Sequence, residues 1–244
     1  MANTFFQFKK FIVHQEHTSM KVCTDACLFG AWAIEHELLQ KASSILDIGT
    51  GTGLLSLMVA QKNTIAKITA VEIEPNAAKQ ASSNFELSDW KERLSVVNTS
   101  IQDFAQSSSD QFDCIISNPP FFETDLPSPD NNKNLAAHSA ALPWEIFAEV
   151  VSKLLSNEGL FFVIIPSIRA YTMQKHMEAN GLQLIEDTTV FNKEKQLPFR
   201  SFLQFKKTTQ KPISIERNKL FIKESNNEYT EVFKSLLKEY YLQF

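Results

Sequence analysis

The chain has 244 residues and is 43% hydrophobic, so it holds enough apolar sequence to bury one large core. Its formal net charge of −4 and isoelectric point near 5.8 argue against a protein that coats polyanions indiscriminately, although they allow a specific nucleic-acid substrate. No apolar run is long enough to cross a bilayer, and no signal peptide is visible. Three cysteines without paired spacing predict reduced thiols, no metal site and a cytoplasmic protein.

The pattern predicts a single domain in three parts, acting as a monomer. Residues 1–42 form an N-terminal extension, in which Thr4–Val13 alternates like a hairpin arm and a helix of small apolar residues begins near Thr24. Residues 43–207 form the catalytic core. Residues 208–244 form an extension whose first half is basic, with an expected terminal helix that ends the chain.

Strands and helices alternate through the core, which predicts an α/β fold with a mostly parallel sheet covered on both faces. A ligand is expected at the C-terminal ends of its strands. The last two strands read as an antiparallel closing pair. The expected strands are Ile45–Ile48, Lys67–Glu72, Leu94–Asn98, Phe112–Ser117, Leu160–Ile165, Leu182–Phe191 and Arg200–Lys207, with a further short one at Leu220–Ile222. The expected helices are Leu54–Gln61, Pro75–Ser88, Pro143–Leu155 and Ile168–Asn180.

A glycine-rich turn directly after the first strand is the central motif. Gly49, Gly51 and Gly53 are three of the six glycines in the chain, and Thr50 lies between the first two. Such a turn at a helix N-terminus can cradle a nucleotide-like ligand, although an ordinary strand-to-helix turn is the alternative. The spacing matches neither the dinucleotide fingerprint nor a Walker A loop. Asp47, at the strand end, is expected to accept hydrogen bonds from loop amides or from a ligand cation.

Acidic residues follow the next two strands. Glu72 ends the second strand, where a carboxylate can accept both hydrogen bonds of a ribose diol. Glu74 competes for this role, but Pro75 indicates that the chain has already turned away. Asp103 and Phe104 follow the third strand and could hold the edge and the face of an adenine; a surface loop is the equal alternative.

The second motif, Asn118-Pro119-Pro120-Phe121, follows the fourth strand. The two prolines remove two amide donors, so the carbonyls of Asn118 and Pro119 are left as acceptors beside the Asn118 side-chain oxygen. Such a group suits a planar NH2 substituent, and Phe121 offers a face on which a base can stack. These four residues are the catalytic candidates.

These motifs, in this order, resemble those of class I methyltransferases that use S-adenosylmethionine. The N-terminal stretch Met20–Trp32 and the Tyr229-Thr230 tail narrow the resemblance, over nearly the full length, to the bacterial tRNA1(Val) adenine-N6 methyltransferase family. The resemblance implies a Rossmann-like, seven-stranded sheet with an antiparallel last strand. It implies N6-methylation of a tRNA adenine at position 37, next to the anticodon. It implies a cofactor site made of Lys21, Thr24, Asp25, Asp47, Gly49, Thr50, Gly51, Gly53, Glu72, Asp103, Phe104 and Asn118.

Other functions share part of this pattern. A guanine-N2 methyltransferase of ribosomal RNA and a protein-glutamine N5 methyltransferase carry a similar Asn-Pro-Pro-aromatic motif. A non-catalytic RNA-binding protein on the same fold is an alternative of another class, but it predicts decayed cofactor motifs. A nicotinamide dehydrogenase is disfavoured by the glycine spacing.

Two features bear on RNA binding. The basic stretch Lys206–Lys223, together with Lys9 and Lys10, is expected to contact a shaped tRNA. His138 lies in the long Phe121–Leu142 connection, as a lid residue touching RNA or as a solvated loop residue.

Overall fold

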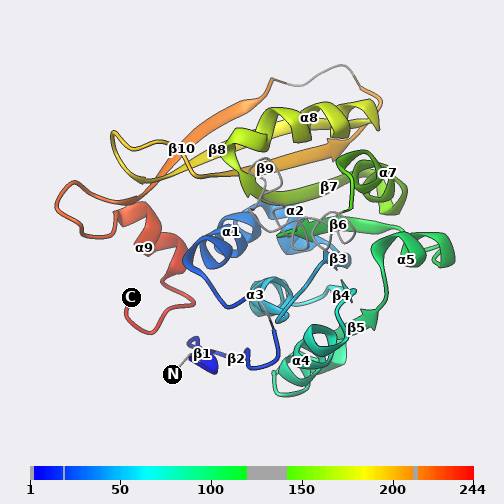
Figure 1. Cartoon of the computed structure of the whole chain (residues 1–244), viewed down its shortest axis with the longest axis horizontal. Coiled ribbons are helices and arrows are strands. Elements are labelled where there is room, and N and C mark those ends of the chain that lie inside the picture. The colour runs from blue at the N-terminus through cyan, green and yellow to red at the C-terminus, as the bar shows by residue number, and fades with distance from the viewer. Residues whose placement is uncertain (1–2, 19, 120–141, 211–213) are drawn as a thin grey trace, which may run out of the picture.

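The computed structural model describes residues 3–18, 20–119, 142–210 and 214–244. The described strands form a two-stranded hairpin, β1-β2, and an eight-stranded sheet in the order β10-β8-β9-β7-β6-β3-β4-β5 (Figure 1). The hairpin strands are β1 (Phe5–Gln7) and β2 (Ile12–His14). The sheet strands are β3 (Ser44–Ile48), β4 (Lys67–Glu72), β5 (Leu94–Asn98), β6 (Phe112–Ser117), β7 (Leu155–Pro166), β8 (Leu182–Lys193), β9 (Arg200–Lys207) and β10 (Glu216–Lys223).

The strand directions confirm the expected α/β fold. Among the described sheet strands, β9 alone runs against its neighbours, paired antiparallel with both β7 and β8. The other pairings are parallel. The seven expected strands are all present. The further short strand expected at Leu220–Ile222 is part of β10, which lies beside β8 and makes the sheet eight-stranded. The C-terminal ends of the parallel strands therefore all lie at one end of the sheet, and β9 begins at that end.

Helices cover both faces of the sheet. Buried residues of α1, α3 and α9 belong to the core on one face, and those of α5, α7 and α8 to the core on the other. The described helices are α1 (Thr24–Ile34), α2 (Glu37–Lys41), α3 (Leu54–Lys62), α4 (Pro75–Glu86), α5 (Ile101–Ser107), α7 (Trp144–Leu154), α8 (Ala170–Ala179) and α9 (Glu231–Leu237), with short 3-10 turns at Lys91–Arg93 and Ser167–Arg169.

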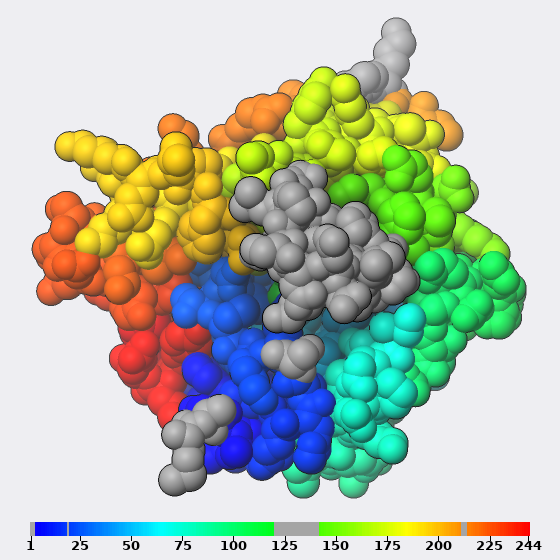
Figure 2. All heavy atoms as spheres, in the orientation of Figure 1, coloured from blue at the N-terminus to red at the C-terminus, as the bar shows by residue number. Residues whose placement is uncertain are grey.

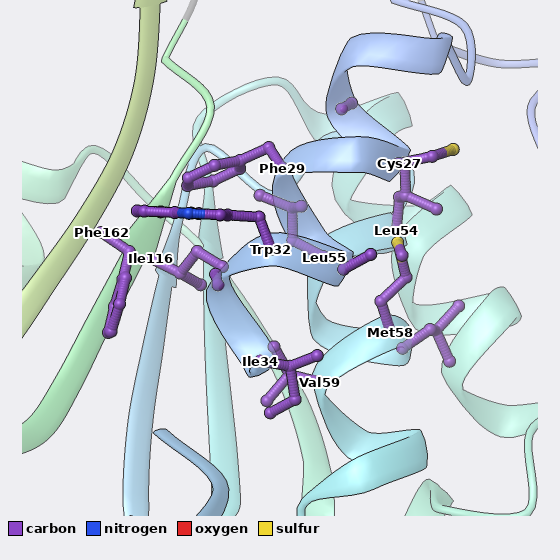
Figure 3. Packing of buried hydrophobic residues seen from close by; sticks show 14 of the residues in the cluster. Cys27, Phe29, Trp32, Ile34, Leu54, Leu55, Met58, Val59, Ile116 and Phe162 are labelled. Carbon is purple, nitrogen blue, oxygen red and sulfur yellow. The ribbon is translucent and has the colours of Figure 1, made fainter. Parts of the chain in front are cut away.

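Helix α1 packs against both the sheet and α3, the helix that follows the glycine-rich turn. Trp32 lies 6.1 Å from the Phe162 ring of β7 and 5.4 Å from the Phe202 ring of β9, centroid to centroid (Figure 3). A Cβ on Gly30 would lie 2.8 Å from the sulfur of Met58, so glycine is what allows α1 to approach α3 this closely.

The two ends of the chain dock on each other. The backbone N–H of Lys9 donates to the Tyr240 carbonyl (2.8 Å), and its ammonium donates to the carbonyls of Lys238 and Phe244 (2.5 Å each). Thr230 caps α9 by accepting from the Phe233 amide (3.2 Å), as the sequence predicts. Lys9 therefore contributes to holding the two termini together, so its ammonium is already engaged.

The sequence located most elements within one or two residues and missed the two short helices α2 and α5. Five to seven residues are too few for a helical periodicity to stand out from a loop. Among the residues that the structure describes, no helix has the length and apolar character needed to span a membrane.

Candidate active site

Three of the predicted motifs lie at the C-terminal ends of three adjacent strands. β3 lies between β4 and β6, with Ile48 opposite both Val71 and Ser117. Glu72, the next residue on β4, and Asn118, the residue after β6, therefore flank the turn that leaves β3. The sheet thus brings the glycine-rich motif, the acid and the Asn-Pro motif to one place, as the sequence predicts.

Asp47 is fully buried beneath this turn. Its Oδ2 accepts hydrogen bonds from the hydroxyls of Thr50 and Ser56, both at 2.7 Å. Its Oδ1 is buried without a hydrogen-bond partner. Burial raises the pKa of the Asp47 carboxyl to about 6, although the two hydroxyl donors oppose the shift. An unpaired buried carboxylate oxygen is costly, which is a physical reason to expect a hydrogen-bonding ligand there.

The glycine-rich turn folds tightly over Asp47. The amides of Gly49 and Thr50 both donate to the Val71 carbonyl (2.8 and 3.3 Å), so the turn is tied to β4. Gly49, Gly51 and Gly53 all have left-handed φ values, of 70°, 58° and 83°. A Cβ at either of the first two would project into open space, whereas a Cβ on Gly53 would lie 2.5 Å from the Phe85 ring. Gly53 is therefore required for packing, and the space above the other two can admit a ligand.

The Glu72 carboxylate bridges two loops at the end of β4. Its Oε2 accepts from the Gly51 amide and its Oε1 from the Glu74 amide, both at 2.9 Å. The side chain is buried, with 8% of the residue exposed. A carboxylate has about four acceptor positions, so two remain for hydroxyl donors. Glu74 instead caps α4, accepting from the amides of Asn76 and Ala77, so its carboxylate is already used.

Asn118 presents an unpaired acceptor. Its side-chain Oδ1 is buried without a hydrogen-bond partner among the described residues, and its Nδ2 lies 4.0 Å from the sulfur of Met20. Pro119 is buried, and the Ser117 hydroxyl anchors the end of β6 by donating to the Ile48 carbonyl (2.8 Å). The other two catalytic candidates, Pro120 and Phe121, lie outside the described residues, as does His138.

The N-terminal segment closes one side of the site, which the sequence did not reveal. Asn84 of α4, 1% exposed, donates to the carbonyls of His14 and Thr52 (2.8 Å each) and accepts from the His14 amide (3.0 Å). It thereby joins β2 to the glycine-rich turn. Gln15, 4% exposed, accepts from the Val22 amide (2.8 Å) and so shapes the bend that carries Met20 to Asn118. The sequence signal for this contact is Asn84 itself, a polar residue on the apolar face of α4.

Of the three N-terminal residues that the resemblance assigns to the cofactor, two have other partners in this structure and one is exposed. The Lys21 ammonium donates to the Gln15 carbonyl. Thr24 is exposed at the start of α1. Asp25 forms an ion pair with Arg200 at the start of β9, with 2.8 Å between Oδ2 and Nε. Their assignment to the cofactor stays a prediction.

Asp103 and Phe104 lie in the first turn of α5. Asp103 is exposed and contacts Ser100, the N-cap of α5, whose hydroxyl donates to the carboxylate (2.7 Å) and accepts from the Asp103 amide (3.1 Å). Phe104 is buried, with its ring 6.3 Å from that of Phe112. This packing favours a core role for Phe104, while Asp103 stays available to a ligand.

The arrangement fits a nucleoside cofactor bearing a cationic group. The turn offers open space above Gly49 and Gly51, Glu72 retains acceptor capacity, and Asp47 keeps one buried oxygen unpaired. Within the described part of the chain, no group of three or more His, Cys, Asp or Glu residues is arranged to hold a metal ion. The polar groups at these strand ends offer hydrogen bonding and placement of charge.

Comparison with known proteins relates this chain to methyltransferases. Residues 30–187 match the family model described as the methyltransferase small domain. A protein from Dyadobacter fermentans named tRNA1(Val) (adenine(37)-N6)-methyltransferase is 40% identical over 99% of both chains. Proteins of the same name from Bacteroides thetaiotaomicron and Haemophilus influenzae strain PittEE are 40% and 37% identical, over 99% and 98% of this chain and 99% of each of theirs.

Solved structures share the fold. A predicted O-methyltransferase from Agrobacterium tumefaciens superposes with a TM-score of 0.68 at 16% identity, over 88% of this chain and 95% of its own. A protein from Listeria monocytogenes assigned to the class I S-adenosylmethionine-dependent methyltransferases gives 0.58 at 18% identity, over 84% and 67%. At such low identity these structures establish the class I fold and leave the methyl acceptor open.

Proposed function

Because this chain belongs to the methyltransferase small domain family, and within it to the tRNA1(Val) (adenine(37)-N6)-methyltransferases, we propose that it methylates N6 of adenine 37 in tRNA1(Val) with S-adenosylmethionine. The observation that carries the proposal is the buried, unpaired Oδ1 of Asn118 beside the glycine-rich turn. An acceptor in that position matches an exocyclic amine, whose two protons need partners.

The residues at the ends of β3 and β4 hold the cofactor. Glu72 accepts hydrogen bonds from the ribose diol through its remaining lone pairs. The unpaired Oδ1 of Asp47 provides an acceptor and a negative charge for a cationic donor. Asp103 is the candidate partner for the adenine edge, because it lies exposed at the start of α5. When bound, S-adenosylmethionine supplies a methyl group on a positively charged sulfur.

Asn118 makes the acceptor amine reactive. An aromatic amine is a poor nucleophile because its lone pair is delocalised into the ring. Hydrogen bonds from the amine to Asn118 Oδ1 and to the Pro119 carbonyl favour a pyramidal nitrogen and stabilise the positive charge that develops on it. Holding the amine in line with the methyl group supplies much of the remaining acceleration. No general base is needed before the transfer.

The adenine must leave its stack to reach this site. A base inside a stacked anticodon loop cannot present its amine at the end of a strand, so we expect it to be flipped out. Phe121, beyond the described residues, is the candidate for stacking on the flipped base. Replacing Phe121 with alanine should weaken tRNA binding by about 1–3 kcal/mol, whereas the Phe121→Tyr variant should keep wild-type affinity.

Nucleoside analysis tests the activity in cells. Digested tRNA from cells that lack this protein should have lost N6-methyladenosine from tRNA1(Val), and restoring the gene should restore it. Restoring the Asn118→Ala variant should not. If tRNA1(Val) keeps its N6-methyladenosine in the absence of the protein, the proposed acceptor is wrong.

Two other acceptors share the Asn-Pro motif: guanine N2 in ribosomal RNA and a protein glutamine amide. A methylation assay that offers mixed RNA and protein with labelled cofactor separates them, and the label should enter tRNA. A non-catalytic RNA-binding role is disfavoured because Asp47, Glu72 and Asn118 are all present, at the ends of three adjacent strands.

We further propose that the whole chain works as one cytoplasmic domain and as a monomer. The docking of Lys9 on the C-terminal residues supports one unit, and three free cysteines, with Cys23 exposed, suit a reducing compartment. Light scattering on the purified protein should give the mass of a single chain.

A further inference from the structure

A cavity of about 470 Å³ lies apart from the glycine-rich turn. It opens where the turn after β8, the turn after β10 and the start of α1 meet, and Figure 2 shows these segments side by side in yellow, orange and blue (Figures 1 and 2). Its lining residues are Thr24, Asp25, Asn192, Phe199, Ile222, Lys223 and Tyr229. The volume lies in the range typical of pockets for small organic molecules.

Two aromatic rings line this cavity. Phe199 is half-buried directly before β9, in a turn whose neighbour Leu197 is 87% exposed. Tyr229 is half-buried and is held from behind by Phe233, whose ring is stacked 4.5 Å away at an interplanar angle of 9°. Because Tyr229 already contacts Phe233 and has the Lys223 ammonium 5.5 Å from its centroid, Phe199 is the candidate platform for a nucleobase.

The cavity also holds an uncommitted positive charge. Among the described residues, Lys223 Nζ has no hydrogen bond or ion pair, and its recorded contact is with the Tyr229 ring, 5.5 Å from the centroid. The Asp25 carboxylate is neutralised by Arg200 at 2.8 Å, so it does not cancel the lysine. An ammonium beside aromatic faces suits a ligand that combines a phosphate with a planar ring.

The position of the cavity relates it to Asn118. In the strand register, Lys223 lies opposite Lys193 at the end of β8, and Arg200 lies opposite Pro166 at the end of β7. The cavity therefore lies at the same end of the strands as Asn118. Three strand spacings separate β6 from β8, which is about 14 Å. A molecule that fills both sites must therefore be an extended one, with Asn118 holding one of its units.

We propose that this cavity binds a second nucleotide of the tRNA, near the methylated adenine in the chain, with its base on Phe199 and its phosphate on Lys223. The proposal rests on the proposed function, because RNA is the extended, anionic and aromatic molecule that this function brings to this end of the strands. It places the RNA contact in the turns after β8 and β10, away from most of the basic stretch Lys206–Lys223.

Three other cations of that stretch already have partners. Lys206 pairs with Glu158 (2.7 Å), and the Lys207 ammonium donates to the carbonyls of Ser152 and Leu155 (2.7 and 2.8 Å). Arg217 pairs with Asp187 (3.2 Å). All three cations lie toward the end of the sheet where the parallel strands begin.

Charge reversal tests the phosphate contact. Lys223→Glu should weaken binding of an unmodified tRNA1(Val) transcript about tenfold near 0.1 M salt, and should lower the slope of log affinity against log salt by about one. Lys153→Glu is the matched control, because Lys153 is exposed at the end of α7, toward the opposite end of the sheet, and should leave both quantities unchanged. Cofactor affinity, measured by calorimetry, should be the same in both variants.

A pair of substitutions tests the stacking. Phe199→Leu keeps an apolar side chain but removes the flat face, so the KM for tRNA should rise roughly fivefold to a hundredfold while kcat is unchanged. Phe199→Tyr keeps the ring and should retain the wild-type KM. Melting temperatures of both variants near the wild-type value establish that they are folded.

Each outcome has one meaning. If wild-type protein methylates the transcript and Lys223→Glu and Phe199→Leu have the wild-type KM and salt slope, the nucleotide site is wrong and the methyltransferase assignment stands. If either variant loses cofactor affinity instead, the cavity belongs to the cofactor and the proposal is overturned. If the wild-type protein methylates no tRNA, the proposed function fails first, and the nucleotide site with it.

Discussion

The two sides of the active site differ in how far the protein satisfies its own polar groups. On the cofactor side, Glu72 and Asp47 accept four hydrogen bonds, two from the glycine-rich turn and two from Ser56 and Glu74, and one Asp47 oxygen alone has no partner among the described residues. On the acceptor side, the side-chain Oδ1 of Asn118 has no partner among the described residues, and the side-chain Nδ2 lies 4.0 Å from the Met20 sulfur.

This difference predicts which residues govern cofactor binding and which govern turnover. A residue that also supports the turn should affect cofactor affinity or stability when it is replaced, because its hydrogen bonds are part of the fold. Asn118, whose side-chain oxygen supports no other part of the fold, should affect the reaction alone when it is replaced. The following experiments are arranged by expected effect, from the largest to the smallest.

The largest effect is expected at Asn118. The Asn118→Ala variant loses one acceptor for the amine, so its kcat should fall on the order of a hundredfold or more. Calorimetry should give an unchanged affinity for S-adenosylmethionine. A variant that binds the cofactor and methylates tRNA at the wild-type rate would remove Asn118 from the mechanism.

The second-largest effect is expected at Glu72, on the affinity for the cofactor. Glu72→Ala should weaken S-adenosylmethionine binding by about 2–3 kcal/mol, since two hydroxyl donors lose a charged acceptor. Glu74→Ala is the matched control: it removes the α4 cap, so it should lower the free energy of unfolding by about 1 kcal/mol without changing the affinity. Equal affinity losses in both variants would contradict the assignment of the ribose to Glu72.

Two glycines with the same backbone conformation should behave differently. Gly53→Ala should lower the free energy of unfolding by about 2 kcal/mol or more, because left-handed strain is added to the clash with Phe85. Gly49→Ala carries the strain without the clash, so its loss of stability should be smaller. Its methyl group should instead obstruct the cofactor, and calorimetry combined with chemical unfolding separates the two effects.

The smallest effect is a pH dependence from Asp47. Its pKa is raised by burial to about 6, so the fraction that is ionised falls as the pH drops below that value. If the ionised form holds the cofactor, affinity should fall about fourfold between pH 7.5 and 5.5, by the usual titration relation. An Asp47→Asn variant should bind more weakly, with a flatter pH profile. A wild-type affinity that is constant over this range would exclude the carboxylate from cofactor binding.

The sequence predicted what depends on short stretches of chain. The strand before Gly49, the acid at the end of β4 and the position of Asn118 all followed from local patterns, and the family resemblance supplied the chemistry. The preference for Glu72 over Glu74 is supported, because Pro75 makes Glu74 a helix cap.

Contacts between distant parts of the chain could not be predicted in this way. Asn84 and Gln15 shape the site through hydrogen bonds to residues up to 70 positions away, and local periodicity carries no information about such partners. The basic stretch shows the same limit. Its residues are close in sequence, but β9 and β10 place Lys207 and Lys223 toward opposite ends of the sheet.

The most direct test of the central claim is methylation of a defined RNA by the purified protein. An unmodified tRNA1(Val) transcript is incubated with S-adenosylmethionine, digested and analysed by mass spectrometry, beside a transcript in which adenine 37 is replaced by guanine. We predict N6-methyladenosine in the first RNA and no methylated base in the second. Equal methylation of both transcripts, or methyl groups on guanine, would contradict the account.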